Sequence, residues 1–273
     1  MPEPGDVSTI ALLTDFGIGD GYPAAMKGVI LRLNPGATLV DISHEVDRHD
    51  IEAGAYVLAS VYRYFPAGTV FLAVVDPGVG GPRRPIVVRT PDYGFVGPDN
   101  GIFSLIYRRE KQLQVNLISD MSFCLSPIAD TFHGRDIFAP VAAHLSLGTD
   151  PDRFGPSLND YLRDRAVGPV ISGDRLACRI VHVDRFGSLV TDLDRQTLQS
   201  FCGDRDVRLI AGSIIIAGIS NTYSDVKIGE PLALFGSAGT LEVAVNQGSA
   251  AELAGLGRGD SVEIKTARHR GGS

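Results

Sequence analysis

The first half of the chain alternates between short apolar runs and segments with helical character. The apolar runs at residues 8–13, 38–42 and 70–75 each have the length of a buried strand. Between them, the segment from Tyr22 to Leu33 has a proline in its first turn and ends at Asn34-Pro35-Gly36. The segment after Asp50 carries apolar residues at spacings of three and four. This strand–helix–strand–helix–strand order is typical of an α/β fold with a mainly parallel sheet flanked by helices.

The pattern changes in the second half of the chain. Residues 86–89 and 93–96 predict a hairpin, residues 113–118 a strand, and a helix is expected from His133 to about Leu147. The chain is then turn-rich up to Gly168, and seven short apolar runs separated by turn signals follow. We therefore expect two domains. The N-terminal α/β domain spans 1–168, and a smaller C-terminal β domain of barrel or sandwich type spans 169–273.

Polar residues follow each of the three predicted parallel strands. They are Asp15, the pair Ser43-His44, and Asp76. The carboxyl ends of parallel strands lie on one edge of a sheet, where ligands bind, so we predict a site at that edge. Asp76 is followed by a glycine- and proline-rich loop and then by Arg83. A polar turn with a salt bridge is the alternative interpretation of this loop.

Two histidines, His44 and His133, could have a chemical role beside these carboxylates. His133 lies at the start of a predicted helix, where a residue without chemical function is the commoner case. His44, His133 and the carboxylates could form a metal site, but no HExxH-type spacing is present. The sequence therefore favours a site without a metal ion.

Composition limits the classes of partner. The 273 residues are 44% hydrophobic and 21% charged, which is ordinary for a globular protein with a sizeable core. The net charge is −7 and the basic residues cluster only at Arg268–Arg270, which argues against nucleic acid. No signal peptide or membrane-spanning run is recognisable. Cys124, Cys178 and Cys202 are isolated, which favours reduced thiols in a cytoplasmic protein.

Eight short blocks occur in order over nearly the whole chain. They are Leu13–Gly17 with Asp20, Asp41–His44, Asp76–Gly80 with Arg83-Arg84, Gly97–Gly101, Phe132–Asp136, Asp184–Gly187, Phe235–Gly239 and Leu241–Asn246. Each block alone is a weak signal, whereas the eight in this order are specific. The chain resembles the S-adenosylmethionine hydrolase family, also called the SAM hydroxide adenosyltransferases, which is related to the fluorinase and the chlorinase.

The resemblance implies a homotrimer whose active sites lie between the N-terminal domain of one subunit and the C-terminal domain of its neighbour. It implies attack of water or hydroxide on the 5′ carbon of S-adenosyl-L-methionine (SAM), giving adenosine and L-methionine without a cofactor. The family's catalytic set falls on Asp76, Arg83 and His133. The substrate-binding residues that it implies are Asp15, Asp20, Gly134, Asp184, Phe186, Ser188, Tyr223, Ser237 and Asn246.

Four of these binding residues have individual expected roles. Asp15 is expected to accept hydrogen bonds from both ribose hydroxyls, because charge-assisted pairs are the strong ones. Tyr223 is expected to pack its ring on adenine, with Asn246 and nearby backbone reading the base edge. Asp184 is expected to pair with the methionine ammonium.

The expected chemistry fits the catalytic set. The sulfonium group leaves as a neutral thioether, so no metal is needed to stabilise it, and the protein must align an oxygen nucleophile opposite the C5′–S bond. We expect Asp76 and His133 to hold and partly deprotonate this water. Arg83 is expected to fix the carboxylate and to favour hydroxide character.

Two departures and two other functions stay open. Relatives usually have asparagine at the positions of Ser188 and Asp192, so the methionine moiety could be held differently here. A SAM- or adenosine-binding sensor with slow turnover would need Asp15, Asp184 and Tyr223 but not the catalytic set. A halogenase would replace that set and carry an extra loop in the N-terminal domain, which we do not recognise, so hydrolysis is favoured.

Overall fold

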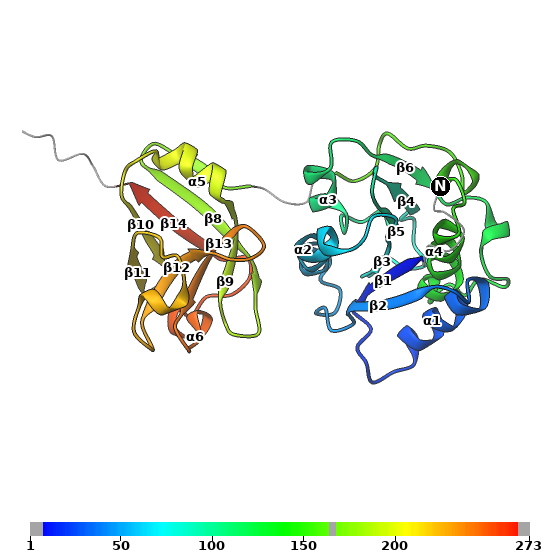
Figure 1. Ribbon diagram of the computed structural model, residues 1–273, viewed down its shortest axis with the longest axis horizontal. Helices are drawn as coiled ribbons and strands as arrows, with labels where there is room; N and C mark the ends of the chain where they lie inside the picture. Colours follow the sequence, from blue (N-terminus) through cyan, green and yellow to red (C-terminus); the bar gives the residue numbers. More distant parts are fainter. Residues whose placement is uncertain (1–7, 164–167, 267–273) are drawn as a thin grey trace, which may run out of the picture. The chain divides into compact units, whose positions relative to one another are not determined.

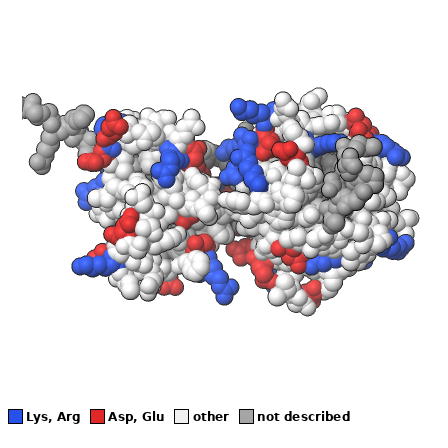
Figure 2. Space-filling model, viewed as in Figure 1, with Lys and Arg blue, Asp and Glu red and all other residues white. Residues whose placement is uncertain are grey.

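A computed structural model describes residues 8–163 and 168–266, which fall into two compact units (Figure 1). The N-terminal unit mixes helices and strands, and the C-terminal unit is mostly β-structure. Among the described residues, no helix is both long and apolar enough to cross a membrane. On the face seen in Figure 2, acidic and basic side chains are interspersed over both units.

The N-terminal unit is built on a six-stranded sheet with the order β2-β1-β3-β5-β4-β6. The strands are β1 (Thr9–Thr14), β2 (Thr38–Ser43), β3 (Val70–Val74), β4 (Pro85–Arg89), β5 (Gly94–Pro98) and β6 (Gln114–Leu117). Strands β2, β1, β3 and β5 pair in parallel, and β4 pairs antiparallel with both of its neighbours. The predicted α/β fold with a mainly parallel sheet is confirmed.

Helices cover both faces of this sheet, and the alternation along β1 shows which residues meet them. Ile10 and Leu12 pack in one cluster with α1 (Tyr22–Leu33) and α4 (Ala139–Ser146). Ala11 and Leu13 pack in the other with α2 (Ile51–Val61) and α3 (Ser104–Arg109). Successive strand residues point to opposite faces, so each face has its own core.

The ends of two helices follow the sequence closely. Helix α1 has the predicted bounds, and the Asp50 carboxylate caps α2 by accepting a hydrogen bond from the Ala53 N–H at 2.9 Å. The helix expected after His133 differs from the prediction. It opens with a wide π-helical turn at Gly134–Phe138, and α4 begins only at Ala139.

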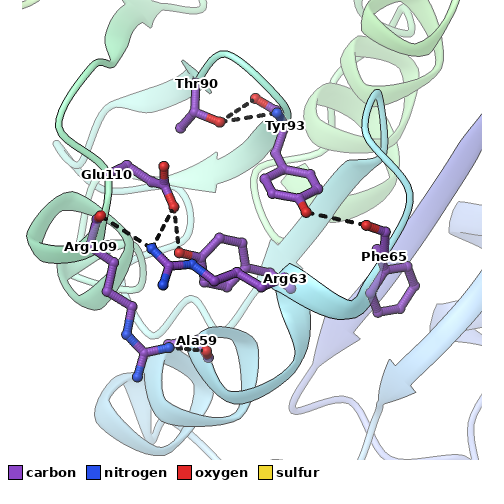
Figure 3. A network of polar contacts seen from close by, with 8 residues as sticks. Ala59, Arg63, Phe65, Thr90, Tyr93, Arg109 and Glu110 are labelled. Carbon is purple, nitrogen blue, oxygen red and sulfur yellow. Dashed lines mark hydrogen bonds and ion pairs between the residues drawn. The ribbon is translucent and has the colours of Figure 1, made fainter.

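A polar network joins the end of α2 to the end of α3 (Figure 3). Tyr62 is fully buried, and its hydroxyl donates to the Glu110 carboxylate at 2.6 Å. Arg63 donates to the same oxygen at 3.1 Å, and the Arg109 guanidinium donates to the Ala59 carbonyl. Burial, reinforced by Glu110, raises the pKa of Tyr62 to about 12, so the phenol stays a donor.

The C-terminal unit is an antiparallel sheet with the order β11-β10-β14-β8-β9-β13-β12, and β7 pairs with β8 at its side. Strands β11 and β12, which stand at the two ends of this order, contact each other, so the sheet curls back on itself around its main apolar core. Its strands are β7 (Val170–Ser172), β8 (Arg175–Val183), β9 (Leu189–Asp194), β10 (Val207–Ala211), β11 (Ile214–Ala217), β12 (Pro231–Phe235), β13 (Thr240–Val245) and β14 (Ser261–Thr266).

All seven strands predicted for this unit are present, and three further elements were not predicted. They are β7, α5 (Arg195–Cys202) and α6 (Ala250–Ala254). Helix α5 is mostly polar, but the Asp194 carboxylate caps it at the Thr197 N–H, and Leu198 and Phe201 bury one side. The residues of β7 are all exposed, so no hydrophobic alternation reveals it.

Removing the Glu110 carboxylate tests how far the polar network stabilises the N-terminal unit. Glu110→Ala leaves the buried Tyr62 hydroxyl without its acceptor, and such a group costs about 1–3 kcal/mol. We expect the free energy of unfolding from urea denaturation to fall by that amount. In a Tyr62→Phe background the same change should cost clearly less. An equal loss in both backgrounds would contradict the role given to this hydrogen bond.

Candidate active site

The candidate site begins at one edge of the N-terminal sheet. Strands β2, β1 and β3 are parallel neighbours, so His44, Asp15 and Asp76 all follow strand ends on the same edge. Strand β5 is parallel to β3 and brings Asp99 to this edge as well. The predicted placement of polar residues at one sheet edge is therefore present in the structure.

Arg83 connects Asp76 to His133. Its Nε lies 2.9 Å from both carboxylate oxygens of Asp76, and its Nη2 also contacts Oδ2. The same Nη2 lies 2.8 Å from Nδ1 of His133, which is 50 residues away in the sequence. The side chains of Asp76 and Arg83 are only 4% and 10% exposed. The structure thus brings the three expected catalytic residues together, with the guanidinium in the middle.

A close backbone approach sets the position of the loop that carries Arg83. Gly80 has a φ of +74°, and a Cβ atom there would lie 2.7 Å from the carbonyl oxygen of Asp130. No side chain fits at that distance, so the glycine lets the loop after Asp76 touch the segment before His133. At the end of the same loop, Arg84 forms an ion pair with Asp99 at 2.7 Å.

The contact with Arg83 assigns the protonation state of His133. A guanidinium can only donate, so Nδ1 must accept and the imidazole is neutral with its proton on Nε2. Burial and the nearby Arg83 charge lower the pKa of His133, although Asp76 and Asp130 oppose the shift. Nε2–H therefore remains as a donor, whereas both oxygens of Asp76 are already bonded to Arg83.

Asp15 is held by the backbone of the segment after β2. Its Oδ2 accepts from the His49 N–H at 2.8 Å, and His49 has a left-handed φ of 65°. His44, which the sequence offers as a possible metal ligand, is buried. Its Nδ1 hydrogen bonds with Thr14 Oγ1 at 2.8 Å, and its Nε2 with the Asp41 carboxylate at 3.1 Å. The histidine therefore ties the ends of β1 and β2 together. Asp20 lies on the exposed turn between β1 and α1.

Gly134 has a packing role that the sequence did not reveal. It is buried, and a Cβ atom there would lie 3.3 Å from the sulfur of Met26 and from the ring of Phe132. The rings of Phe132, Phe16 and Tyr22 contact one another, with centroids 5.1–5.9 Å apart. Gly134 therefore leaves room for an aromatic cluster directly after His133.

The expected binding residues of the C-terminal unit include a tight turn after β8. Oδ1 of Asp184 accepts from the backbone N–H groups of Phe186 at 2.9 Å and Ser188 at 2.8 Å. One carboxylate oxygen is thus used to fix the turn, which leaves Phe186 80% exposed at its tip. The Asp192 carboxylate accepts a hydrogen bond from the Arg179 N–H, so it links β9 to the neighbouring strand β8.

Tyr223 meets a residue that the sequence analysis did not single out. Its hydroxyl lies 3.3 Å from Oε2 of Glu242, whereas the residue itself is 43% exposed. Glu242 is 7% exposed and stands in the apolar run of β13. A carboxylate inside such a run was the available signal, because buried glutamates are rare unless paired.

Asn246 fixes a neighbouring segment. Its side-chain amide donates to the Val226 carbonyl at 2.8 Å, and its backbone N–H and C=O bond to Glu230 and Gly229. These bonds fix the 226–230 segment, and the contact of Asn246 with a base edge stays a prediction. Ser237 lies in the turn between β12 and β13. Over residues 8–163 and 168–266, no group of three or more His, Cys, Asp or Glu side chains could hold a metal ion.

Comparison with known proteins gives consistent matches. The family models described as SAM hydroxide adenosyltransferase N-terminal domain and C-terminal domain match residues 10–155 and 178–263. The (R)-S-adenosyl-L-methionine hydrolase of Thermus thermophilus is 38% identical, over 93% of this chain and 98% of that protein. A fluorinase of Actinoplanes is 26% identical, over 98% and 100%. The crystal structure of a conserved protein from Thermotoga maritima superposes with a TM-score of 0.87 at 36% identity, over 94% and 99%.

A titration of the histidine rings tests the assigned state of His133. We expect its pKa, followed by NMR, to lie below 6.5 and to rise in Arg83→Met, because the cation that disfavours the imidazolium is gone while Asp76 remains. The hydrogen bond to Arg83 should be lost as the pH falls through this lowered pKa.

His144 is the matched control for this titration. Burial and Arg153 lower its pKa too, and Arg83→Met should leave it where it is. A His133 pKa that does not move in Arg83→Met would contradict the contact between the two side chains.

Proposed function

The chain belongs to the SAM hydroxide adenosyltransferase family, and we propose that it hydrolyses SAM to adenosine and L-methionine. The observation that carries this proposal is the hydrogen-bonded cluster of Asp76, Arg83 and His133 at the sheet edge that also holds Asp15. Relatives 33–38% identical over 93% of the chain are named (R)-S-adenosyl-L-methionine hydrolase, which supports the same reaction here.

In the proposed reaction, an O–C5′ bond forms as the C5′–S bond breaks, and the electron pair moves to sulfur. The products are adenosine, neutral methionine thioether and one proton that passes to solvent. The sulfonium is already an activated leaving group, so we propose that no cofactor takes part. The protein's task is then to hold one oxygen in line with the C5′–S bond and to exclude competing geometries.

The protonation state of His133 gives that task a specific form. Its Nε2–H donates to the nucleophile, and the Arg83 charge stabilises the hydroxide form of a bound water, so both lower the pKa of that water. Asp76 orients Arg83. This differs from the expected role of His133 as a partial base, because its other nitrogen is already bonded to Arg83.

We propose that the two units supply different parts of the substrate site. Asp15 holds the ribose hydroxyls with the oxygen that His49 leaves open, and Asp20 and Gly134 border that region. Tyr223 offers its ring to adenine, and Asp184 meets the methionine ammonium through Oδ2. Phe186, Ser188 and Ser237 lie in the turns beside these two residues. Asn246 shapes the neighbouring segment.

We propose a homotrimer in which the N-terminal unit of one subunit and the C-terminal unit of its neighbour complete each site. The support is the family membership and the division of the binding residues between two compact units. Halogenation is the second candidate, because fluorinases are among the relatives. The intact Asp76–Arg83–His133 cluster favours hydrolysis. A binding protein with incidental turnover would not need that cluster.

We also propose that the protein acts in the cytoplasm. All three cysteines are unpaired, and two of them are buried. Burial raises the pKa of Cys124 to about 11 and that of Cys178 to about 12, so both thiols stay protonated and unreactive.

Incubation of the purified protein with SAM, followed by mass spectrometry of the products, tests the reaction. We expect adenosine and L-methionine, with oxygen from labelled water in the 5′-hydroxyl, and no 5′-halo product when chloride or fluoride is added. His133→Ala should lose about 10²–10³-fold in kcat with little change in KM, as for removal of one oriented donor.

His144→Ala serves as the control for a histidine outside the cluster and should keep wild-type turnover. The combined loss in Arg83→Ala with His133→Ala should fall far short of the product of the single losses. Full turnover in His133→Ala would remove the proposed mechanism.

Subunit complementation tests the shared site. Asp76→Ala and Asp184→Ala should each be inactive or severely impaired, and co-expressed mixtures should regain activity, because some sites then combine two intact units. Light scattering should give a trimer for each preparation. Mixed trimers that stay as inactive as the parents would contradict a site shared between subunits.

A further inference from the structure

Glu242 is a buried carboxyl group without a cationic partner. It lies on β13 between Leu241 and Val243, whose side chains belong to the apolar core of the C-terminal unit. No ion pair joins it to a basic residue in the described part of the chain, and the charge that acts on it is that of Asp184, which has the same sign. Burial of an unpaired carboxyl group is costly, so its presence here calls for a role.

The space around this carboxyl group is shaped to hold it. A Cβ atom on Gly236 would lie 1.7 Å from Oε1 of Glu242, so a larger residue there would displace the carboxyl group from this position. Oε2 lies 3.3 Å from the Tyr223 hydroxyl. The β12–β13 turn and the segment of Tyr223 therefore both meet Glu242, and Tyr223 is assigned above to substrate binding.

A second set of contacts fixes the main chain of Tyr223. It opens a short 3₁₀ turn, Tyr223–Asp225, in which the Thr222 and Asp225 side chains form a reciprocal capping box. Oδ2 of Asp225 accepts from the N–H groups of Asn221 at 2.8 Å and Thr222 at 3.2 Å. With its main chain held by this box and its hydroxyl held by Glu242, the ring has little freedom left, while the residue stays partly exposed.

We propose that Glu242 is a positioning residue that fixes the plane of the Tyr223 ring for a purine nucleoside. The inference rests on the proposed function, because it takes Tyr223 as the surface that receives adenine. Glu242 does not touch the ligand. It acts through the phenol oxygen, and Gly236 keeps the carboxyl group in place.

The charge state of Glu242 provides a readout that a purely structural role would not change. Burial, together with Asp184, raises the pKa of Glu242 above its ordinary value of 4.5, against the hydrogen bond from Tyr223. The residues that pair with Glu242 from β9 and β12 are Val190 and Leu234, so Asp184 and Tyr223 are the titratable groups that face it.

Adenosine binding measured by calorimetry on the full chain tests the proposal without relying on turnover. Tyr223→Phe and Glu242→Ala should each weaken binding roughly two- to tenfold, the range for one lost hydrogen bond. The double variant should be no weaker than the poorer single variant, because both changes remove one interaction. Gly236→Ala should weaken binding similarly by displacing the carboxyl group.

Glu242→Gln keeps the shape and a hydrogen-bonding side chain without the charge. Its affinity for adenosine should match the wild type while the pH is below the raised pKa of Glu242, and it should separate from the wild type as the pH rises through that pKa. Glu263→Gln, at a carboxylate that pairs with Arg175 and Lys265 on β14, is the matched control and should change nothing.

Additive losses in the double variant, or unchanged adenosine affinity in Glu242→Ala and Tyr223→Phe, would overturn the positioning role while leaving SAM hydrolysis in place. Failure of the wild type to bind adenosine at all would overturn both this inference and the proposed function. Glu242→Gln that tracks the wild type at every pH would overturn the link to the charge of Glu242.

Discussion

The candidate site depends on one buried cation with two acceptors. Arg83 offers a planar set of N–H groups, and Asp76 and His133 take up those on one side of it. The carboxylate balances the charge, and the imidazole accepts a hydrogen bond that a charged ring could not accept. The loop geometry around Gly80, the neutral state of His133 and the engagement of both Asp76 oxygens all follow from placing this guanidinium at the centre. A lysine could not replace it, because a single ammonium lacks the fork that reaches both partners.

Periodicity and turn chemistry were sufficient to predict most of the fold. The length of α1, the Asp50 cap and the seven strands of the C-terminal unit were all readable, because each rests on local patterns of apolar spacing or capping. The order of the strands was not readable. The antiparallel pairing of β4 with β5 was predicted as a hairpin, whereas the place of β4 between β5 and β6 is seen only in the hydrogen-bond register. The wide turn before α4 also leaves no local signature.

The sequence likewise predicted some parts of the candidate site and missed others. That Asp15 and Asp76 share an edge follows from a parallel sheet, and the link from Asp76 to His133 came from a resemblance, since 57 residues of sequence separate them and no local rule joins them. Glu242 was missed because a glutamate in a strand is normally read as a solvent-facing residue. The bond from the Asn246 amide to the Val226 carbonyl was not predicted either, because it depends on how two loops meet.

The hydrogen bond between Arg83 and Nδ1 has a consequence for the imidazole ring itself. Turning the ring over would place a carbon against the guanidinium, so the bond holds a single orientation, with the same nitrogen always facing outward. A histidine that takes part only as a donor ends each reaction in the state in which it began. Such a histidine needs no proton removed from it and no ring rearrangement before the next substrate enters.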